Sequence, residues 1–139
     1  MNVFLDTNVL MDVLLDRQPF VAESEQVWFL ADRGKIRGFV SALSFPNVYY
    51  IVRKVRGTEA AMAMMAMLRD TFTPVPLDEQ ILNQAMDAGF PDLEDAIQHA
   101  SARRADADCF LTRNADDFPQ SNELPVLTPA EFLSAHRFE

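Results

Sequence analysis

Short apolar runs alternate along this chain with longer stretches in which apolar residues recur at helical spacing. The runs predict strands at residues 3–5, 35–40, 71–75, 108–112 and 126–127. The longer stretches predict helices at residues 8–15, 20–32, 44–56, 58–68, 78–88 and 92–105, and a last helix that begins near residue 128. Because strands alternate with helices throughout, we expect an α/β fold in which helices cover both faces of a parallel sheet.

Polar residues at the predicted helix boundaries support these assignments. Ser44, Asp78 and Asp92 each stand where an N-cap is needed. Residues 128–131 read Thr-Pro-Ala-Glu, a capping box with proline at the first helical position. Pro74 places the third strand at an edge of the sheet or at a strand end.

Size and composition predict one cytoplasmic domain that spans residues 1–139. Hydrophobic residues make up 49% of the chain and charged residues 24%, as in an ordinary globule. No apolar run approaches the roughly 18–20 residues of a membrane span, and no signal peptide is recognisable. The single cysteine, Cys109, fits a reducing compartment, and its apolar surroundings predict a buried side chain rather than a nucleophile.

The net charge of −9 argues against one class of nucleic-acid binder. A protein that holds nucleic acid through broad electrostatics presents a basic face, which this composition does not provide. The charge is compatible with an enzyme that holds nucleic acid through metal ions on carboxylates, and also with a basic partner protein.

Acidic residues fall at three places where strands and helices join. They are Asp6 after the first strand, Asp92, Glu94 and Asp95 at the start of a late helix, and Asp116 and Asp117 after the fourth strand. In a parallel sheet the carboxyl ends of the strands share the edge at which ligands bind. Carboxylates gathered there repel one another, and a hard cation such as Mg²⁺ or Mn²⁺ relieves the repulsion.

Each of these acids also has a structural explanation. Asp92 could cap a helix, with Asp95 closing the capping box. Asp116 and Asp117 could be a solvated loop pair, and Asp6 could accept hydrogen bonds from the amides of the next helix. Spacing alone leaves both explanations open.

Three segments of the chain resemble the PIN domain family. They read VFLDTN at residues 3–8, DLEDAIQ at residues 92–98 and LTRNADDF at residues 111–118. The likeness continues through VLTP at residues 126–129 and so covers nearly the whole chain. It implies a three-layer α/β/α sandwich with a parallel sheet of about five strands and Mg²⁺- or Mn²⁺-dependent cleavage of RNA. Small bacterial members of this family are often toxins that an antitoxin partner holds silent.

Carried over by position, the resemblance assigns Asp6, Asp95 and Asp117 as the catalytic and metal-binding acids. Glu94 and Asp116 are further candidate ligands beside them. The metal would bind the scissile phosphate and lower the pKa of the attacking water.

Other residues are candidates for supporting roles. Asn8 and Asn114 could orient water or phosphate, and Thr7 and Ser41 could do the same. Arg113 is a candidate contact to the RNA backbone, together with the basic helix end at residues 53–56. A surface cation without such a role is the alternative for each of these basic residues.

The chain departs from the family at one position. Where the family usually has a Glu in the helix after the second strand, this sequence offers Asn47. An amide oxygen can coordinate a metal but adds no charge. We therefore expect one ion held weakly or through water rather than a tight pair, and a PIN-like module that binds RNA or an antitoxin with little or no catalysis is the alternative function.

Other enzymes of this architecture fit less well. A haloacid-dehalogenase-like enzyme needs an Asp two residues after its nucleophile, where this chain has Asn8. A response-regulator receiver needs a late lysine, and Lys35 and Lys54 both come too early. No glycine-rich turn follows the first strand, so we expect no nucleotide cofactor.

Two further features concern packing and assembly. His99 lies four residues after Asp95 on the same helical face, and we expect it to be a structural histidine. The methionines of residues 58–68 could pack in the core or bind a partner helix or a second copy, and we expect a homodimer.

Overall fold

The computed structural model describes residues 1–138, and Glu139, the last residue of the expected domain, lies outside the described part. Five parallel strands form one sheet in the order β3-β2-β1-β4-β5. The strands are Asn2–Leu5 (β1), Arg37–Ser41 (β2), Thr73–Val75 (β3), Cys109–Leu111 (β4) and Val126–Leu127 (β5). The expected parallel sheet of an α/β fold is confirmed, and β3 lies at its edge as Pro74 predicts.

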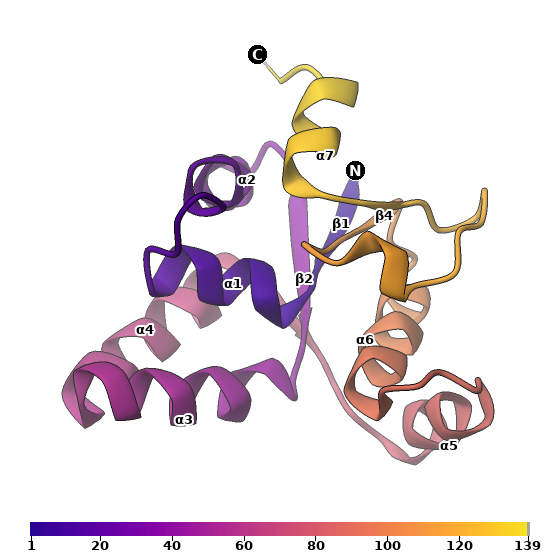
Figure 1. Ribbon diagram of the computed structural model, residues 1–139, viewed down its shortest axis with the longest axis horizontal. Helices are drawn as coiled ribbons and strands as arrows, with labels where there is room; N and C mark the ends of the chain where they lie inside the picture. Colours follow the sequence, from indigo (N-terminus) through magenta and orange to yellow (C-terminus); the bar gives the residue numbers. More distant parts are fainter. Residues whose placement is uncertain (139) are drawn as a thin grey trace.

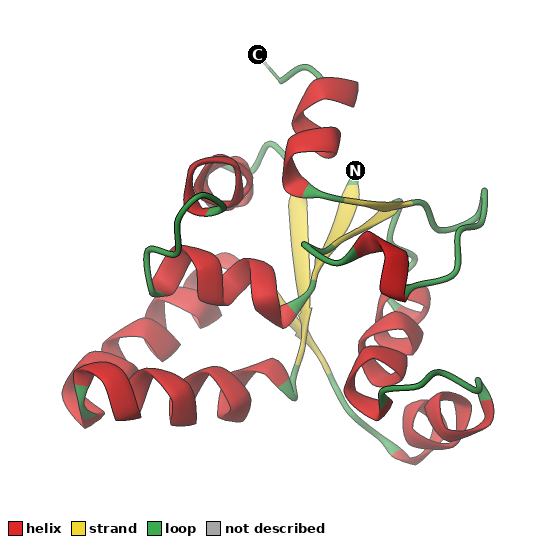
Figure 2. Ribbon diagram, in the orientation of Figure 1, coloured by secondary structure: helices red, strands yellow, loops and turns green. Residues whose placement is uncertain are grey.

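Helices cover both faces of this sheet (Figures 1 and 2). One face carries α1 (Thr7–Leu14), α2 (Val21–Asp32), α3 (Ser44–Arg56), α4 (Thr58–Thr71) and α7 (Pro129–Ala135). The other face carries α5 (Glu79–Asp87) and α6 (Leu93–Arg104). A single turn of 3₁₀ helix, η1 (Ala115–Asp117), follows β4. Within residues 1–138 no helix is long and apolar enough to cross a membrane.

The central strand β1 is apolar because both of its faces are buried. Val3 and Leu5 pack on the side of α1 to α4, and Phe4 packs on the side of α5 and α6. Phe4 is in register with Phe110 of β4, and their stacked rings lie 5.2 Å apart. A strand buried on both faces reads as a continuous apolar run rather than an alternating one.

Side chains fix the starts of several helices as the sequence predicts. Asp78 and Asp92 each accept a hydrogen bond from the backbone N–H three residues on, both at 2.9 Å. The capping box of α7 is complete. The Thr128 hydroxyl accepts from the Glu131 N–H at 3.1 Å, and the Glu131 carboxylate accepts from the Thr128 N–H at 2.9 Å. These bonds satisfy amides that a helix start otherwise leaves without partners.

Ser44 does not cap α3, so that prediction was wrong. It is the first residue of the helix, and Leu43 before it already has helical angles and makes no side-chain cap. The Ser44 hydroxyl is buried and lies 2.7 Å from the Thr7 hydroxyl of α1. Ser44 thus bonds a residue of another helix, Thr7, and not a backbone amide at the start of α3.

Candidate active site

Asp6 lies at the end of the central strand, between β1 and α1. The strand order reverses here, because β2 lies on one side of β1 and β4 on the other, and such a switch point is where α/β proteins bind ligands. Asp6 is 4% exposed and acts as the N-cap of α1, accepting the Asn8 N–H at 3.3 Å. Its other oxygen accepts the Thr112 hydroxyl at 2.7 Å. Both of its carboxylate oxygens are therefore held in place.

Thr112 ties the end of β4 to the start of α1. Its side chain is fully buried, and besides donating to Asp6 its hydroxyl accepts from the Asn8 amide at 3.3 Å and the Asn114 N–H at 3.1 Å. The side-chain oxygen of Asn8, Oδ1, in turn accepts a hydrogen bond from the backbone N–H of Arg113 at 3.2 Å. Two of the predicted supporting residues, Asn8 and Asn114, thus lie in the network around Asp6.

Gln98 attaches α6 to the same centre. Its side-chain oxygen accepts the Thr7 N–H at 2.9 Å and the Thr7 hydroxyl at 3.2 Å. Thr7 also contacts Ser44, so α1, α3 and α6 meet at this hydroxyl. Gln98 is 1% exposed, and a buried amide without such partners would cost free energy. The position of Asp6 relative to α6 is consequently well defined.

Asp95 shows how close the acids of the site are to one another. It lies half-buried in the first turn of α6. Burial first, and then the negative charges of Asp6, Asp92, Asp117 and Glu94, raise the pKa of Asp95 to about 6. Carboxylates that share a site disfavour each other's ionisation. Acids from β1, α6 and η1, far apart in the sequence, therefore lie in one field of negative charge.

Burial also raises the pKa of Asp6. Hydrogen bonds from Thr112, the Asn8 backbone, Gln98 and the Thr7 backbone oppose this shift, because they stabilise the ionised form. The site thus combines a buried carboxylate with donors that favour its charge.

The donor set fits a hard divalent cation in its chemistry and its charge. Carboxylate oxygens are the ligands that Mg²⁺ and Mn²⁺ prefer, and a cation would relieve the repulsion that raises the pKa of Asp95. Among residues 1–138, however, no group of three or more Asp, Glu, His or Cys side chains converges closely enough to enclose an ion. The acids share a field, but their oxygens do not surround one point.

The two acids of η1 differ in their relation to this field. Asp117 is among the charges that raise the pKa of Asp95. Asp116 is exposed and lines a cavity of about 520 Å³ together with Asp117, Asn114 and Glu131. Of the two acids, Asp117 thus shows an electrostatic link to Asp95, and Asp116 shares a cavity with Asp117.

Asn47 lies half-buried in the first turn of α3. The hydrogen bond that links α3 to the Asp6 network comes from Ser44, three residues earlier. Asn47 and this link therefore lie in the same turn of α3.

The Arg113 side chain forms its ion pair with Asp12 of α1. Its guanidinium donates to Asp12 of α1 at 2.9 Å and lies 4.3 Å from the centre of the Phe20 ring. Asp12 is 1% exposed and also has Arg17 at 3.9 Å. Burial raises the pKa of Asp12, and these two arginines oppose the shift. The side chain that we considered for RNA contact is thus engaged in a largely buried ion pair.

Three polar residues of this region did not emerge from the sequence as candidates: Thr112, Gln98 and Asp12. Thr112 ends a strand at the ligand-binding edge, which is the same signal that identified Asp6. Gln98 is a polar residue on the buried face of α6, three positions after Asp95. Asp12 stands among the apolar positions of α1, where a solvent-facing acid is not expected.

The His99 and Cys109 side chains both pack among aromatic or apolar neighbours. The His99 ring packs against Phe90 at 5.3 Å, Phe110 at 6.0 Å and Phe118 at 6.3 Å. Burial and the charge of Arg103 lower the pKa of His99. Cys109 is buried, and burial together with Asp108 raises the pKa of its thiol to about 12, so it is protonated at neutral pH.

We compared the chain with protein families, curated proteins and solved structures. The model of the PIN domain family matches residues 2–116. No curated protein matches the sequence. A toxin-antitoxin complex from Klebsiella pneumoniae is similar in structure, with a TM-score of 0.68 and 21% identity over 91% of this chain and 97% of that one.

Other similar structures show the same fold at lower identity. VapBC-1 from nontypeable Haemophilus influenzae is 17% identical, with a TM-score of 0.66 over 94% of this chain and 99% of that one. Mycobacterium tuberculosis VapC20, described as a sarcin-ricin loop cleaving toxin, is 16% identical, with a TM-score of 0.62 over 78% and 86%. The family match covers most of the sequence, including β1 and α6 with their acids, and this chain belongs to the PIN domain family.

Proposed function

We propose that this protein is a divalent-metal-dependent endoribonuclease in which Asp6, Asp95 and Asp117 hold Mg²⁺ or Mn²⁺. The main support is the position of Asp6 at the switch point of the sheet, together with the negative charges of Asp6, Asp92, Asp117 and Glu94, which add to the effect of burial in raising the pKa of Asp95 to about 6. A bound cation explains why a protein would keep mutually repelling acids together. Membership of the PIN domain family adds the reaction class.

Different residues around Asp6 have different roles in the proposed reaction. A bound metal supplies a water of lowered pKa and offsets charge on the departing oxygen. Thr112 and the Asn8 backbone keep the Asp6 carboxylate oriented. Asn8 and Asn114 would orient water or phosphate, and Glu94 and Asp116 would be further oxygen ligands for the metal.

The absence of charge at Asn47 limits how tightly the site holds metal. With an amide where the family usually has a carboxylate, one ion held weakly fits better than a close pair. Within residues 1–138 no three acids converge enough to enclose an ion, which agrees with weak binding of one ion.

We further propose that the protein is the toxin of a toxin-antitoxin pair, acting in the cytoplasm as a single domain and as a homodimer. The similar structures include complexes described as toxin-antitoxin pairs and a toxin described as cleaving the sarcin-ricin loop. A net charge of −9 suits a basic antitoxin as partner.

The decisive experiment is a cleavage assay on structured and unstructured RNA with Mg²⁺ or Mn²⁺. Asp6→Asn and Asp95→Asn should each lower the cleavage rate by at least about 100-fold, since each removes a ligand and not merely its support. Asp70→Asn is the matched control, because Asp70 is 73% exposed on α4. Metal-dependent cleavage that persists in both site variants would refute the assignment.

A second function is favoured by Asn47 alone. If the missing carboxylate prevents catalysis, the chain is a module that binds RNA or an antitoxin without cleaving. RNA binding by the wild-type protein, with no cleavage in either metal, would identify this alternative.

A further inference from the structure

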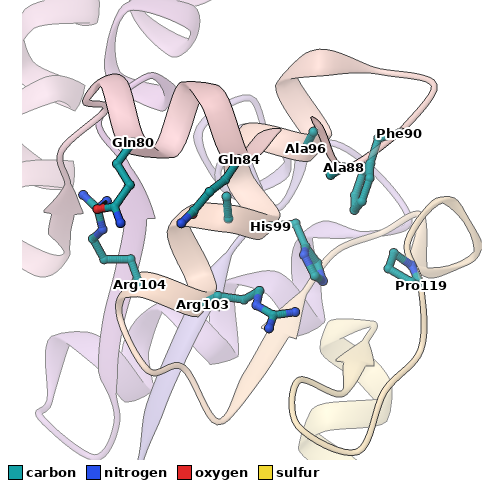
Figure 3. A pocket seen from close by; sticks show the side chains of 10 residues that line it. Gln80, Gln84, Ala88, Phe90, Ala96, His99, Arg103, Arg104 and Pro119 are labelled. Atoms are coloured by element: carbon teal, nitrogen blue, oxygen red, sulfur yellow. Dashed lines mark hydrogen bonds between the residues drawn. The ribbon is translucent and has the colours of Figure 1, made fainter. Parts of the chain in front are cut away.

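A cavity of about 620 Å³ lies between α5, α6 and the loop that follows η1 (Figure 3). Its wall includes Gln84 of α5, Ala96, His99 and Arg103 of α6, and Phe90 and Pro119 at one end. We call this cavity the α5–α6 groove. Its volume lies in the range of pockets that bind small ligands or single nucleotides, about 300–1,000 Å³.

The groove runs along α6, the helix whose first turn carries Asp95. Asp95, His99 and Arg103 stand at successive four-residue intervals, so they lie along one face of the helix. The rise from Asp95 to Arg103 is about 12 Å at ~1.5 Å per residue. Ala96, next to Asp95 in the chain, is itself part of the wall. A polymer whose scissile phosphate lies at the acids can therefore extend into the groove.

One end of the groove is aromatic. The Phe90 ring lies 5.3 Å from His99 and 6.1 Å from Phe118, and His99 stacks on Phe118 with an interplanar angle of 21°. In Figure 3, Phe90 and Pro119 are on the His99 side of the cavity. Phenylalanine and histidine rings are the usual platforms for unstacked bases of single-stranded RNA.

The other end carries cations and amides. Arg104 is fixed by Asp78 and by Gln80, whose side-chain oxygen is 2.6 Å from the guanidinium. Arg103 is 62% exposed and is 4.0 Å from Glu123, which is a contact of little strength. It can therefore turn toward a phosphate at low cost. Gln84 offers both a donor and an acceptor to the edge of a base.

We propose that the α5–α6 groove binds one unstacked base of single-stranded RNA together with its phosphate, next to the phosphodiester bond that is cut. Phe90 and His99 stack on the base, Gln84 contacts its edge and Arg103 binds the phosphate. The proposal rests on the proposed function. In a chain of net charge −9, RNA affinity must come from such a local site rather than from a broad basic face.

The test is RNA binding without cleavage, measured in the Asp6→Asn background by fluorescence anisotropy with a short labelled single-stranded RNA of mixed sequence. Arg103→Gln should weaken binding about 5-fold and reduce the salt dependence by about 0.7 in the log–log slope, the value for one phosphate on a single strand. Phe90→Leu keeps an apolar side chain but removes the ring, and should weaken binding by about 5-fold or more. Arg69→Gln is the control, since Arg69 is 74% exposed on α4 across the sheet.

An abasic scan of the same RNA locates the bound base. Removing that base should weaken binding to the parent protein and have no further effect in Phe90→Leu, because the two changes remove the same contact. Melting temperatures of all variants check that the fold is retained.

Binding of Arg103→Gln and Phe90→Leu equal to that of Arg69→Gln overturns the proposal. So does a shift of the two groove variants toward a smaller assembly without a change in RNA affinity, which would make the groove a contact between copies of the chain. Failure of the proposed function is separate. A wild-type protein that cleaves no RNA but shows these binding differences keeps the groove and loses the nuclease.

Discussion

Asp95 links the charge of the site to the stability of the protein. Its pKa rises from the ordinary value of 3.8 to about 6 in the folded protein, so its ionisation costs stability increasingly above about pH 4 and fully above about pH 6. In metal-free buffer at pH 8, Asp95→Asn should raise the free energy of unfolding by about 1–2 kcal/mol, allowing for solvent screening. The gain should shrink as the pH falls through 6 and vanish below about 4, where Asp95 is protonated in both states.

Urea denaturation in EDTA across this pH range measures the effect. Asp70→Asn is again the control and should change stability little at any pH, because Asp70 is exposed. Equal stability of Asp95→Asn and wild type at pH 8 would contradict the raised pKa of Asp95, whether burial or repulsion causes it.

Thr112 is the residue on which the orientation of Asp6 depends. Thr112→Val keeps the shape but removes a hydroxyl that donates to Asp6 at 2.7 Å and accepts from Asn8. Buried partners are left unsatisfied, so we expect a loss of about 1–3 kcal/mol in the free energy of unfolding. The pKa of Asp6 should rise further, because the Thr112 bond lowers it.

The conservative variant Thr112→Ser separates the hydroxyl from the side-chain volume. It should retain most of the stability and of the RNA cleavage. A Thr112→Val protein as stable as Thr112→Ser would show that the bond to Asp6 is dispensable.

The residues that could be found from the sequence are those whose local pattern is unusual. Asp6 was identifiable because an apolar strand stops at a carboxylate. The roles of Thr112 and Gln98 were not, because their partners lie 106 and 91 residues away and only the fold brings each pair together. Both explanations of Asp6 hold in part, since it caps α1 and also belongs to the acidic field.

At the scale of elements, β2 and α2 approach each other closely at Gly38. A methyl group on Gly38 would lie 2.5 Å from Cδ1 of Phe72 and 3.2 Å from Cβ of Ala31. Phe72 cannot easily yield, because its ring is 3% exposed and is set edge-on against Trp28 at 4.9 Å. Gly38→Ala should therefore lower the free energy of unfolding by about 1–3 kcal/mol through overpacking.

Thermal unfolding followed by circular dichroism tests this expectation. Gly34→Ala is a useful comparison, because it changes a glycine at φ 71° that has no atom within 4 Å of the added methyl group. Its cost would come from backbone strain, whereas that of Gly38→Ala should fall when Phe72 is also replaced by leucine.

Element types were predictable here, and their ends less so. The helix predicted at residues 58–68 continues to Thr71, and β3 is correspondingly shorter than residues 71–75. The helix ends where Phe72 turns into the core beneath Trp28, a contact that no local pattern contains. The capping box at Thr128, by contrast, is complete within four residues and was found from the sequence.

For the molecule as a whole, metal should act as a stabilising ligand. A ligand at 100 times its dissociation constant adds about 2.7 kcal/mol to the stability of a protein that binds it only when folded. Mn²⁺ or Mg²⁺ should thus raise the melting temperature of the wild type, and more at pH 8 than at pH 5, because protonation of Asp95 competes with the ion.

Asp6→Asn should show no such rise in melting temperature while remaining folded in EDTA. Ca²⁺ serves as a second probe of whether oxygen ligands alone suffice. An identical metal-induced rise in Asp6→Asn and wild type would place the ion elsewhere.

The alternation of strands and helices in the sequence predicts the overall architecture but not the order of the strands in the sheet. Alternating strands and helices predict a parallel sheet with covered faces. That β1 lies between β2 and β4 depends on which strands bury their apolar faces best against each other, as Phe4 and Phe110 do. This order decides which acids meet, so the site depends on a property of the whole chain.

The hydrogen bond between Asp6 and Thr112 has a consequence for folding during synthesis on the ribosome. β1, the central strand of the sheet, is the first strand to be translated. The Asp6 carboxylate that follows it can bond Thr112 only after another 106 residues have been translated. Closing so long a loop comes late in folding, after the local contacts of α1 to α4. A nascent chain that ends before β4 has Asp6 without Thr112 and without Asp117. The site proposed here is therefore incomplete until both β4 and η1 have been translated.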